Sequence, residues 1–73
     1  MRITVKLFAT FRKGRFDAEV REVPPGATVS SVIDGLRLPG SVGIIFVNSQ
    51  HADPTRELAD GDTLAVFPLV GGG

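Results

Sequence analysis

The stretch that decides the fold spans residues 24–37 and reads Pro-Pro-Gly-Ala-Thr-Val-Ser-Ser-Val-Ile-Asp-Gly-Leu-Arg. The two prolines stop any preceding strand, because proline lacks the amide hydrogen that a β-ladder needs. Thr28 is a candidate N-cap for a following helix. Apolar side chains then recur at the spacing of one helix face, namely Val29, Val32, Ile33 and Leu36. We therefore expect one short helix over about residues 29–37, held by packing on a sheet because so short a helix is marginal alone.

Strand-like segments flank this helix on both sides. Before it, residues 2–9 and 16–23 alternate apolar and polar side chains, and residues 10–15 form a connecting loop between them. A period of two in β-branched residues is typical of half-buried strands, so the two segments predict an antiparallel hairpin. After the helix, residues 43–48 form a nearly continuous apolar run, which favours a more fully buried strand.

The rest of the chain predicts a last strand after a polar connection. Residues 49–62 are rich in turn signals and leave room for one short edge strand near residues 51–53. Residues 63–69 predict the last strand, whose ladder should thin out at Pro68. The polar connection lacks helical periodicity, which argues against a ferredoxin-like fold with a second helix.

One helix covers only one face of a sheet, so the element order predicts two layers. We expect an α+β fold in which a mixed sheet of four to five strands packs against one helix. This order, in a chain of 73 residues, fits a β-grasp, or ubiquitin-like, fold. The expected organisation is one domain over residues 1–70, followed by a flexible glycine tail over residues 71–73.

Composition excludes several classes of protein. The chain has no cysteine, which rules out disulfide scaffolds, iron–sulfur clusters, thiolate zinc sites and cysteine nucleophiles. Eight lysines and arginines balance eight aspartates and glutamates, so there is no electrostatic signature for nucleic acid or an anionic membrane. No signal peptide is visible, and no apolar run approaches the about 18 residues of a membrane span. The expected location is the cytoplasm.

Residues that carry catalysis or bind metals are scarce. His51 is the only histidine, and its polar surroundings predict a surface side chain. His51 and Asp53 would supply two metal ligands at best, whereas protein metal sites usually need three or four. We therefore expect no metal and no permanently bound cofactor.

The end of the chain is the most distinctive feature. Gly71, Gly72 and Gly73 follow directly on the last predicted strand. Without Cβ atoms this tail is thin and conformationally permissive, and it reaches roughly 10 Å. Its terminal carboxylate can therefore thread into a narrow pocket of another protein.

Three segments of the chain resemble the MoaD/ThiS sulfur carriers, the family of the molybdopterin synthase small subunit and the carrier of thiazole synthesis. They are the opening Val-Lys-Leu-Phe-Ala-Thr-Phe-Arg (5–12), the turn Leu-Ala-Asp-Gly-Asp (58–62) and the ending Phe-Pro-Leu-Val-Gly-Gly-Gly (67–73). The resemblance covers the whole chain, and the ending is its most specific part.

The resemblance implies a mechanism in which the chain is a protein cosubstrate and not an enzyme. An E1-like partner would use ATP to convert the Gly73 carboxylate to an acyl-adenylate. A sulfur donor would then replace AMP and leave a thiocarboxylate. A second partner, the large subunit of molybdopterin synthase or thiazole synthase, would accept the sulfur and supply the catalytic groups.

Partner binding is expected near the tail. Phe67, Leu69 and Val70 are apolar where the last strand ends, so they either fill the core or form an exposed docking patch. The resemblance adds Phe8 and Arg12 as further partner-binding candidates beside that patch.

The sequence leaves several acceptors open. Phe67-Pro68 resembles the Phe-Pro-Pro stretch of molybdopterin synthase small subunits, although Leu69 replaces the second proline. The opening motif also favours the molybdopterin branch, which we prefer, while the short length favours the thiazole carrier. Acceptors such as tRNA thiolation or a tungsten-cofactor pathway remain as further alternatives. A hypothesis of another class is a ubiquitin-like modifier or interaction module.

Overall fold

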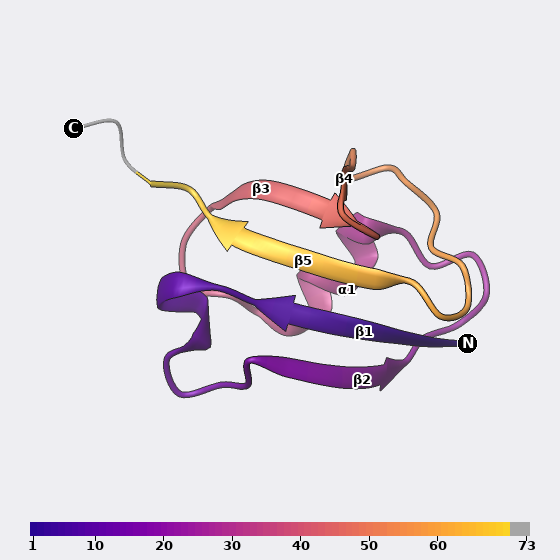
Figure 1. Ribbon diagram of the computed structural model, residues 1–73, viewed down its shortest axis with the longest axis horizontal. Helices are drawn as coiled ribbons and strands as arrows, with labels where there is room; N and C mark the ends of the chain where they lie inside the picture. Colours follow the sequence, from indigo (N-terminus) through magenta and orange to yellow (C-terminus); the bar gives the residue numbers. More distant parts are fainter. Residues whose placement is uncertain (71–73) are drawn as a thin grey trace.

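The computed structural model describes residues 1–70, so the expected glycine tail over residues 71–73 lies outside the described residues. The elements in chain order are β1 (Arg2–Leu7), the 3₁₀ helix η1 (Ala9–Arg12), β2 (Ala18–Glu22), α1 (Val29–Leu36), β3 (Val42–Val47), β4 (Gln50–His51) and β5 (Thr63–Pro68). The strands form one sheet in the order β2-β1-β5-β3-β4 (Figure 1). The central pair, β1 and β5, is parallel, whereas the other pairs are antiparallel. The predicted mixed sheet of a β-grasp fold is confirmed.

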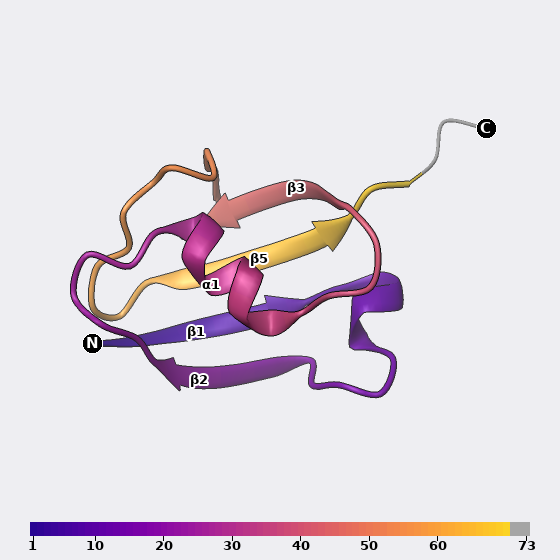
Figure 2. The same cartoon turned by 180° about the vertical axis from the view of Figure 1, so that it is seen from behind.

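Helix α1 lies across one face of the sheet, as the view from behind shows (Figure 2). Its start is fixed by the predicted N-cap. The Thr28 hydroxyl accepts the Ser31 amide at 3.2 Å, and the Ser31 hydroxyl accepts the Thr28 amide at 3.0 Å. The helix ends at Leu36, one residue earlier than expected, because Arg37 adopts a left-handed conformation with φ 51°. In the described part of the chain, no helix is long and apolar enough to cross a membrane.

The core lies between α1 and the sheet. Every second residue of the central strands points into it, namely Ile3, Val5, Leu7, Leu64, Val66, Ile45 and Val47. The helix contributes Val29, Val32 and Leu36.

The predicted loop over residues 10–15 is wrong in its first part. Residues 9–12 form η1, which brings Phe11 fully into the core. Ala9 has φ 52°, a left-handed conformation that turns the chain sharply after β1. Burial of the Phe11 ring offsets the cost of this turn, an effect that strand periodicity cannot reveal.

The expected half-burial of residues 16–23 is also wrong. β2 is shorter, and Val20 is 62% exposed. Val20 pairs with Thr4 on the face away from α1, and β2 is an edge strand.

The apolar run 43–48 is only partly buried, contrary to expectation. Ile45 and Val47 enter the core, but Ile44 is 45% exposed on the opposite face. The last strand ends at Pro68, where its ladder was expected to thin out.

A hydrogen-bond network ties the start of β5 to the end of β3. The buried Asp62 carboxylate accepts the Ala59 amide and the Asn48 side-chain amide, each at 2.8 Å. The Asn48 side-chain oxygen in turn accepts the Thr63 amide at 2.9 Å. The Ala59 amide, and then Asn48, lower the pKa of Asp62 below its ordinary value, because both bonds favour the ionised carboxylate.

This pKa shift predicts acid sensitivity of the fold. A carboxyl with a lowered folded-state pKa stabilises the fold above its unfolded pKa of about 3.9, and this contribution is lost as the pH falls through the folded pKa. We expect Asp62→Asn to cost about 2 kcal/mol at pH 7 and to flatten the decline in stability below about pH 4. Urea unfolding at pH 7 and below about pH 4 measures the free energy of unfolding of each variant. Asp34→Asn, an exposed carboxylate on α1, is the matched control. If Asp62→Asn and wild type lose equal stability on acidification, the interpretation is wrong.

Candidate functional site

The end of β5 carries its apolar side chains away from the core. Val66 is the last buried residue of the strand, and Phe67 lies on the face that α1 does not cover. Leu69 and Val70 are 64% and 83% exposed. The sequence left open whether these residues fill the core or form a surface patch, and the structure places all three outside the core.

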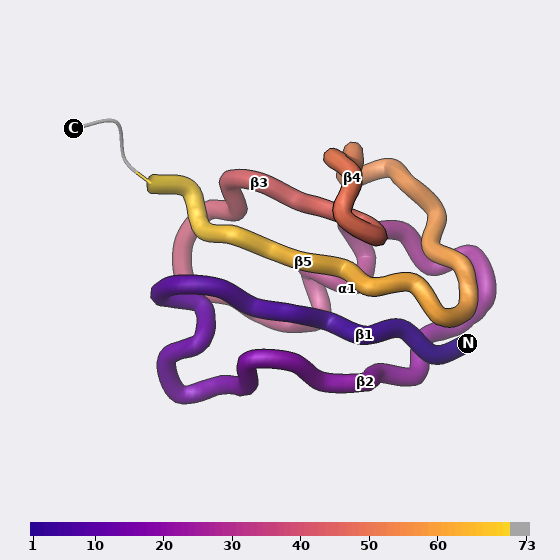
Figure 3. The backbone as a smooth tube through the Cα atoms, in the orientation of Figure 1, coloured from indigo at the N-terminus to yellow at the C-terminus, as the bar shows by residue number. Residues whose placement is uncertain are grey.

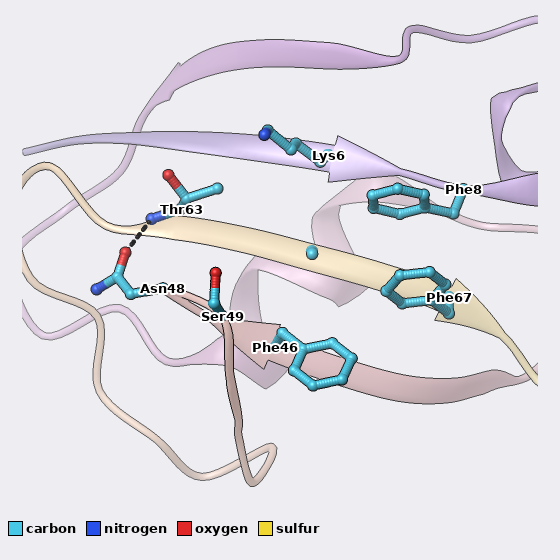
Figure 4. Close-up of a pocket in the computed structure, with 8 residues that line it drawn as sticks. Lys6, Phe8, Phe46, Asn48, Ser49, Thr63 and Phe67 are labelled. Atoms are coloured by element: carbon cyan, nitrogen blue, oxygen red, sulfur yellow. Dashed lines mark hydrogen bonds between the residues drawn. The ribbon is translucent and has the colours of Figure 1, made fainter.

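Three phenylalanines from three different segments meet on this open face. The rings of Phe8 and Phe67 are stacked, with centroids 4.1 Å apart and planes 10° from parallel. Phe46 meets Phe67 edge-on, with a centroid distance of 5.8 Å and an interplanar angle of 80°. We call Phe8, Phe46 and Phe67 the aromatic triad. Its members follow β1 or lie on β3 and β5, so the strand order of the sheet assembles it (Figure 4).

Arg12 fixes one side of the triad. Its guanidinium carbon lies 4.9 Å from the centroid of the Phe8 ring, a cation–π distance. Its Nε donates to the Leu7 carbonyl at 2.6 Å and lies 3.5 Å from a carboxylate oxygen of Asp17. Of the two residues singled out through the family resemblance, Phe8 therefore lies directly beside Phe67, and Arg12 lies beside Phe8.

The aromatic triad lines one end of an open groove of about 650 Å³. Figure 4 shows polar side chains at the other end of this groove, contributed by Lys6, Asn48 and Thr63. Asn48 is already committed to the network at Asp62 and Thr63. The groove thus combines an apolar end, suited to partner side chains, with a cationic and hydrogen-bonding end.

Sequence reasoning missed Phe46 as a member of the site. The residues of β3 alternate between the two faces, so Phe46 shares the open face with Ile44 while Ile45 and Val47 enter the core. The available signal was the single predicted helix, which leaves one sheet face uncovered. His51 is exposed, as predicted, and its ring lies 4.9 Å from Phe46.

The described residues offer little for catalysis or metal binding. Within residues 1–70 there is no group of three histidine, aspartate or glutamate side chains that could hold a metal ion. The three glycines predicted to thread into partners, Gly71, Gly72 and Gly73, lie outside the described residues. The structure does define where the chain leaves the sheet, after Pro68, and it defines the apolar face formed there by the aromatic triad.

Comparison with known proteins gives a consistent assignment. The model of the ThiS family matches residues 5–73. A putative molybdopterin converting factor subunit 1 from Pyrococcus furiosus is 33% identical, with a TM-score of 0.81 over 96% of this chain and 99% of that one. SAMP1 from Haloferax volcanii is 26% identical, with a TM-score of 0.78 over the full length of both chains.

A more distant structure shares the fold. It is a complex of subunits 1 and 2 of molybdopterin-converting factor from Helicobacter pylori 26695, matched at 21% identity and a TM-score of 0.66 over 100% of both chains. No curated protein matches the chain. Since the family model spans almost the whole sequence and the β-grasp fold superposes on relatives of the same kind, this chain belongs to the ThiS family of small ubiquitin-like sulfur carriers.

Proposed function

We propose that this chain carries sulfur as a thiocarboxylate on Gly73 and delivers it in cofactor biosynthesis. One observation carries the proposal. β5 ends at Pro68 beside an aromatic groove that α1 does not cover, and the exposed residues Leu69 and Val70 follow it, directly before the three glycines in the sequence. The residues that precede the proposed handle, Leu69 and Val70, therefore lie at the same end of the described fold as the aromatic end of the groove.

The chemistry at Gly73 would begin with activation. A carboxylate is a poor electrophile, so an E1-like partner would join it to the α-phosphate of ATP and release pyrophosphate. A sulfur nucleophile at the oxidation level of sulfide would then attack the carbonyl carbon. The new C–S bond forms as the C–O bond to AMP breaks, which leaves the thiocarboxylate. ATP is a substrate of the activating partner and not a cofactor of this chain.

The aromatic triad would supply the binding energy for these partners. Aromatic side chains are enriched at the energetic centres of protein interfaces. The stack of Phe8 on Phe67 is already formed, and the contact with Arg12 restrains it further, so little ordering is needed on binding. Exposed Leu69 and Val70 extend the same apolar surface toward the tail.

Catalysis in this proposal belongs to the partners. Among residues 1–70, the side chains that line the groove are a lysine, an amide, hydroxyls and apolar groups, and none of them is a carboxylate or histidine that could act as a general base. The chain would therefore act as a protein cosubstrate, or as the small subunit of a synthase whose large subunit holds the active site.

Among possible acceptors we favour the molybdopterin pathway. The Pyrococcus furiosus relative, at 33% identity, is described as a putative molybdopterin converting factor subunit. The opening motif and Phe67-Pro68 point the same way. The thiazole carrier is the main alternative, supported by the name of the matching family model. To decide between them, the rate of sulfur transfer from the thiocarboxylated chain is measured with a molybdopterin synthase large subunit and with thiazole synthase. The acceptor that receives the sulfur faster identifies the pathway.

A second candidate function is protein modification. A second Haloferax volcanii structure that this chain resembles is described as small archaeal modifier protein 1. Conjugation also begins with adenylation, so the tail suits both functions. Intact mass spectrometry of protein from the native host separates them. A thiocarboxylate adds the difference between a sulfur and an oxygen atom, whereas conjugates are high-mass species that survive denaturation.

Removal of Gly72 and Gly73 tests the proposed handle. We expect the truncated chain to melt at the wild-type temperature, because the core ends at Val66, yet to lose adenylation completely. Pyrophosphate release with the cognate E1-like enzyme measures adenylation, and circular dichroism measures the melt. Adenylation of the truncated chain at the wild-type rate would refute the mechanism.

Truncation of Phe67 tests the docking face. We expect Phe67→Ala to weaken binding to the E1-like enzyme by about tenfold or more, as central aromatic residues of interfaces do. Val20→Ala is the matched control, because Val20 is an exposed apolar residue of the same face on distant β2. Calorimetric titration measures both affinities. Equal affinities for the two variants would show that partners do not use the aromatic triad.

A further inference from the structure

The backbone beyond β5 remains attached to the fold for one more residue. The Leu69 amide donates to the Ser41 carbonyl at 2.9 Å, just after Pro68 pairs with Val42. The Leu69 side chain is largely exposed, and the hydrogen bond that attaches this residue is a backbone one. Figure 3 shows the segment after β5 passing beside the start of β3.

Gly43 makes this close approach possible. A Cβ atom at position 43 would lie 2.8 Å from the Leu69 Cα and 2.8 Å from the Pro68 carbonyl oxygen. Both are backbone atoms, which cannot swing aside as a side chain does. The register of the β3–β5 pairing shifts between Val42 and Ile44, which leaves Gly43 at the irregular position facing the departing chain. Glycine is needed here for space.

We propose that Ser41 and Gly43 form a tail clamp, which fixes the root of the tail at Leu69 so that partner enzymes receive a handle of set length and direction. This inference rests on the proposed function. The clamp leaves four residues, 70–73, beyond the fixed point. At full extension they span about 13–14 Å, which bounds how far the reactive carbon lies from the folded body.

The clamp is separable from the stability of the fold. Gly43 is exposed and lies outside the buried core. The β3–β5 ladder continues without it through Ile45 with Val66 and Val47 with Leu64. A substitution that opens the clamp should therefore free Leu69 while the core stays intact.

Gly43→Ala tests the clamp against Gly35→Ala as a matched control. A Cβ at Gly35 on α1 would meet nothing within 4 Å, so the same chemical change is harmless there. Amide hydrogen exchange measures whether Leu69 is released, and ATP–pyrophosphate exchange with the cognate E1-like enzyme measures KM and kcat for the carrier. We expect Gly43→Ala to speed exchange at Leu69 and to raise KM about tenfold, because a freed residue must be ordered on binding. Because this ordering cost weakens the ground state and the transition state of the complex equally, we expect kcat to stay within about twofold of the wild-type value.

A one-glycine insertion after Val70 tests the length of the handle without altering the folded body. We expect kcat to fall about tenfold or more, because misplacement of a reacting group is costly. Three results would each overturn the clamp. The first is a Gly43→Ala variant in which Leu69 exchanges faster but KM is unchanged. The others are a Gly35→Ala variant whose KM rises equally, and an insertion variant whose kcat is unchanged. A wild-type chain that is not adenylated at all would refute the proposed function instead, and exchange at Leu69 would then alone decide whether the clamp exists.

Discussion

A single eight-residue helix packed on a five-stranded sheet is the constraint on which the rest of this structure depends. Such a helix covers the central strands on one face only. The side chains of β5 therefore divide between two environments, with Val66 in the core and Phe67 on the open face. Alternate residues of the same strands thus form the buried core and line the open groove. A second helix on the open face would have buried the aromatic triad and left no groove.

Local sequence features were enough to predict most of the elements. Thr28 and the 3.6-residue spacing after it predicted α1, and the last strand was predicted over residues 63–69, one residue longer than β5. The face that each strand presents to the core was harder to predict, because it depends on pairing between distant segments. Val20 alternates as a half-buried residue would, yet it is exposed because the position of β2 at the sheet edge is set by its pairing with β1. Phe11 was missed because of a local effect. Ala9 adopts a left-handed conformation, and the turn that it makes directs Phe11 into the core.

The candidate site shows the same division between local and distant information. The glycines of the tail form a contiguous motif, so sequence alone could single them out. The aromatic triad is not contiguous. Phe8, Phe46 and Phe67 become neighbours only because β5 lies between β1 and β3 in the sheet. Phe67 was accessible from its place at the end of the last strand and Phe8 through family resemblance, whereas Phe46 required knowledge of which face of β3 points away from α1.

The strand that carries the tail is restrained at both of its ends. At its start, the Thr63 amide donates to Asn48 within the network around Asp62. Along its length it pairs with β1 on one side and β3 on the other, and beyond its end the Leu69 amide is held by Ser41. Fraying that begins at the tail must first break the Leu69 bond. Opening of the next residue, Pro68, breaks a pair to which proline donates no amide hydrogen bond. Further opening must break the aromatic contacts of Phe67 and then expose the buried Val66. The energetic barrier to further opening therefore rises steeply within three residues. The exposed chain end at Leu69 and Val70 is in this way separated from the buried core by a few residues that are held by several different contacts.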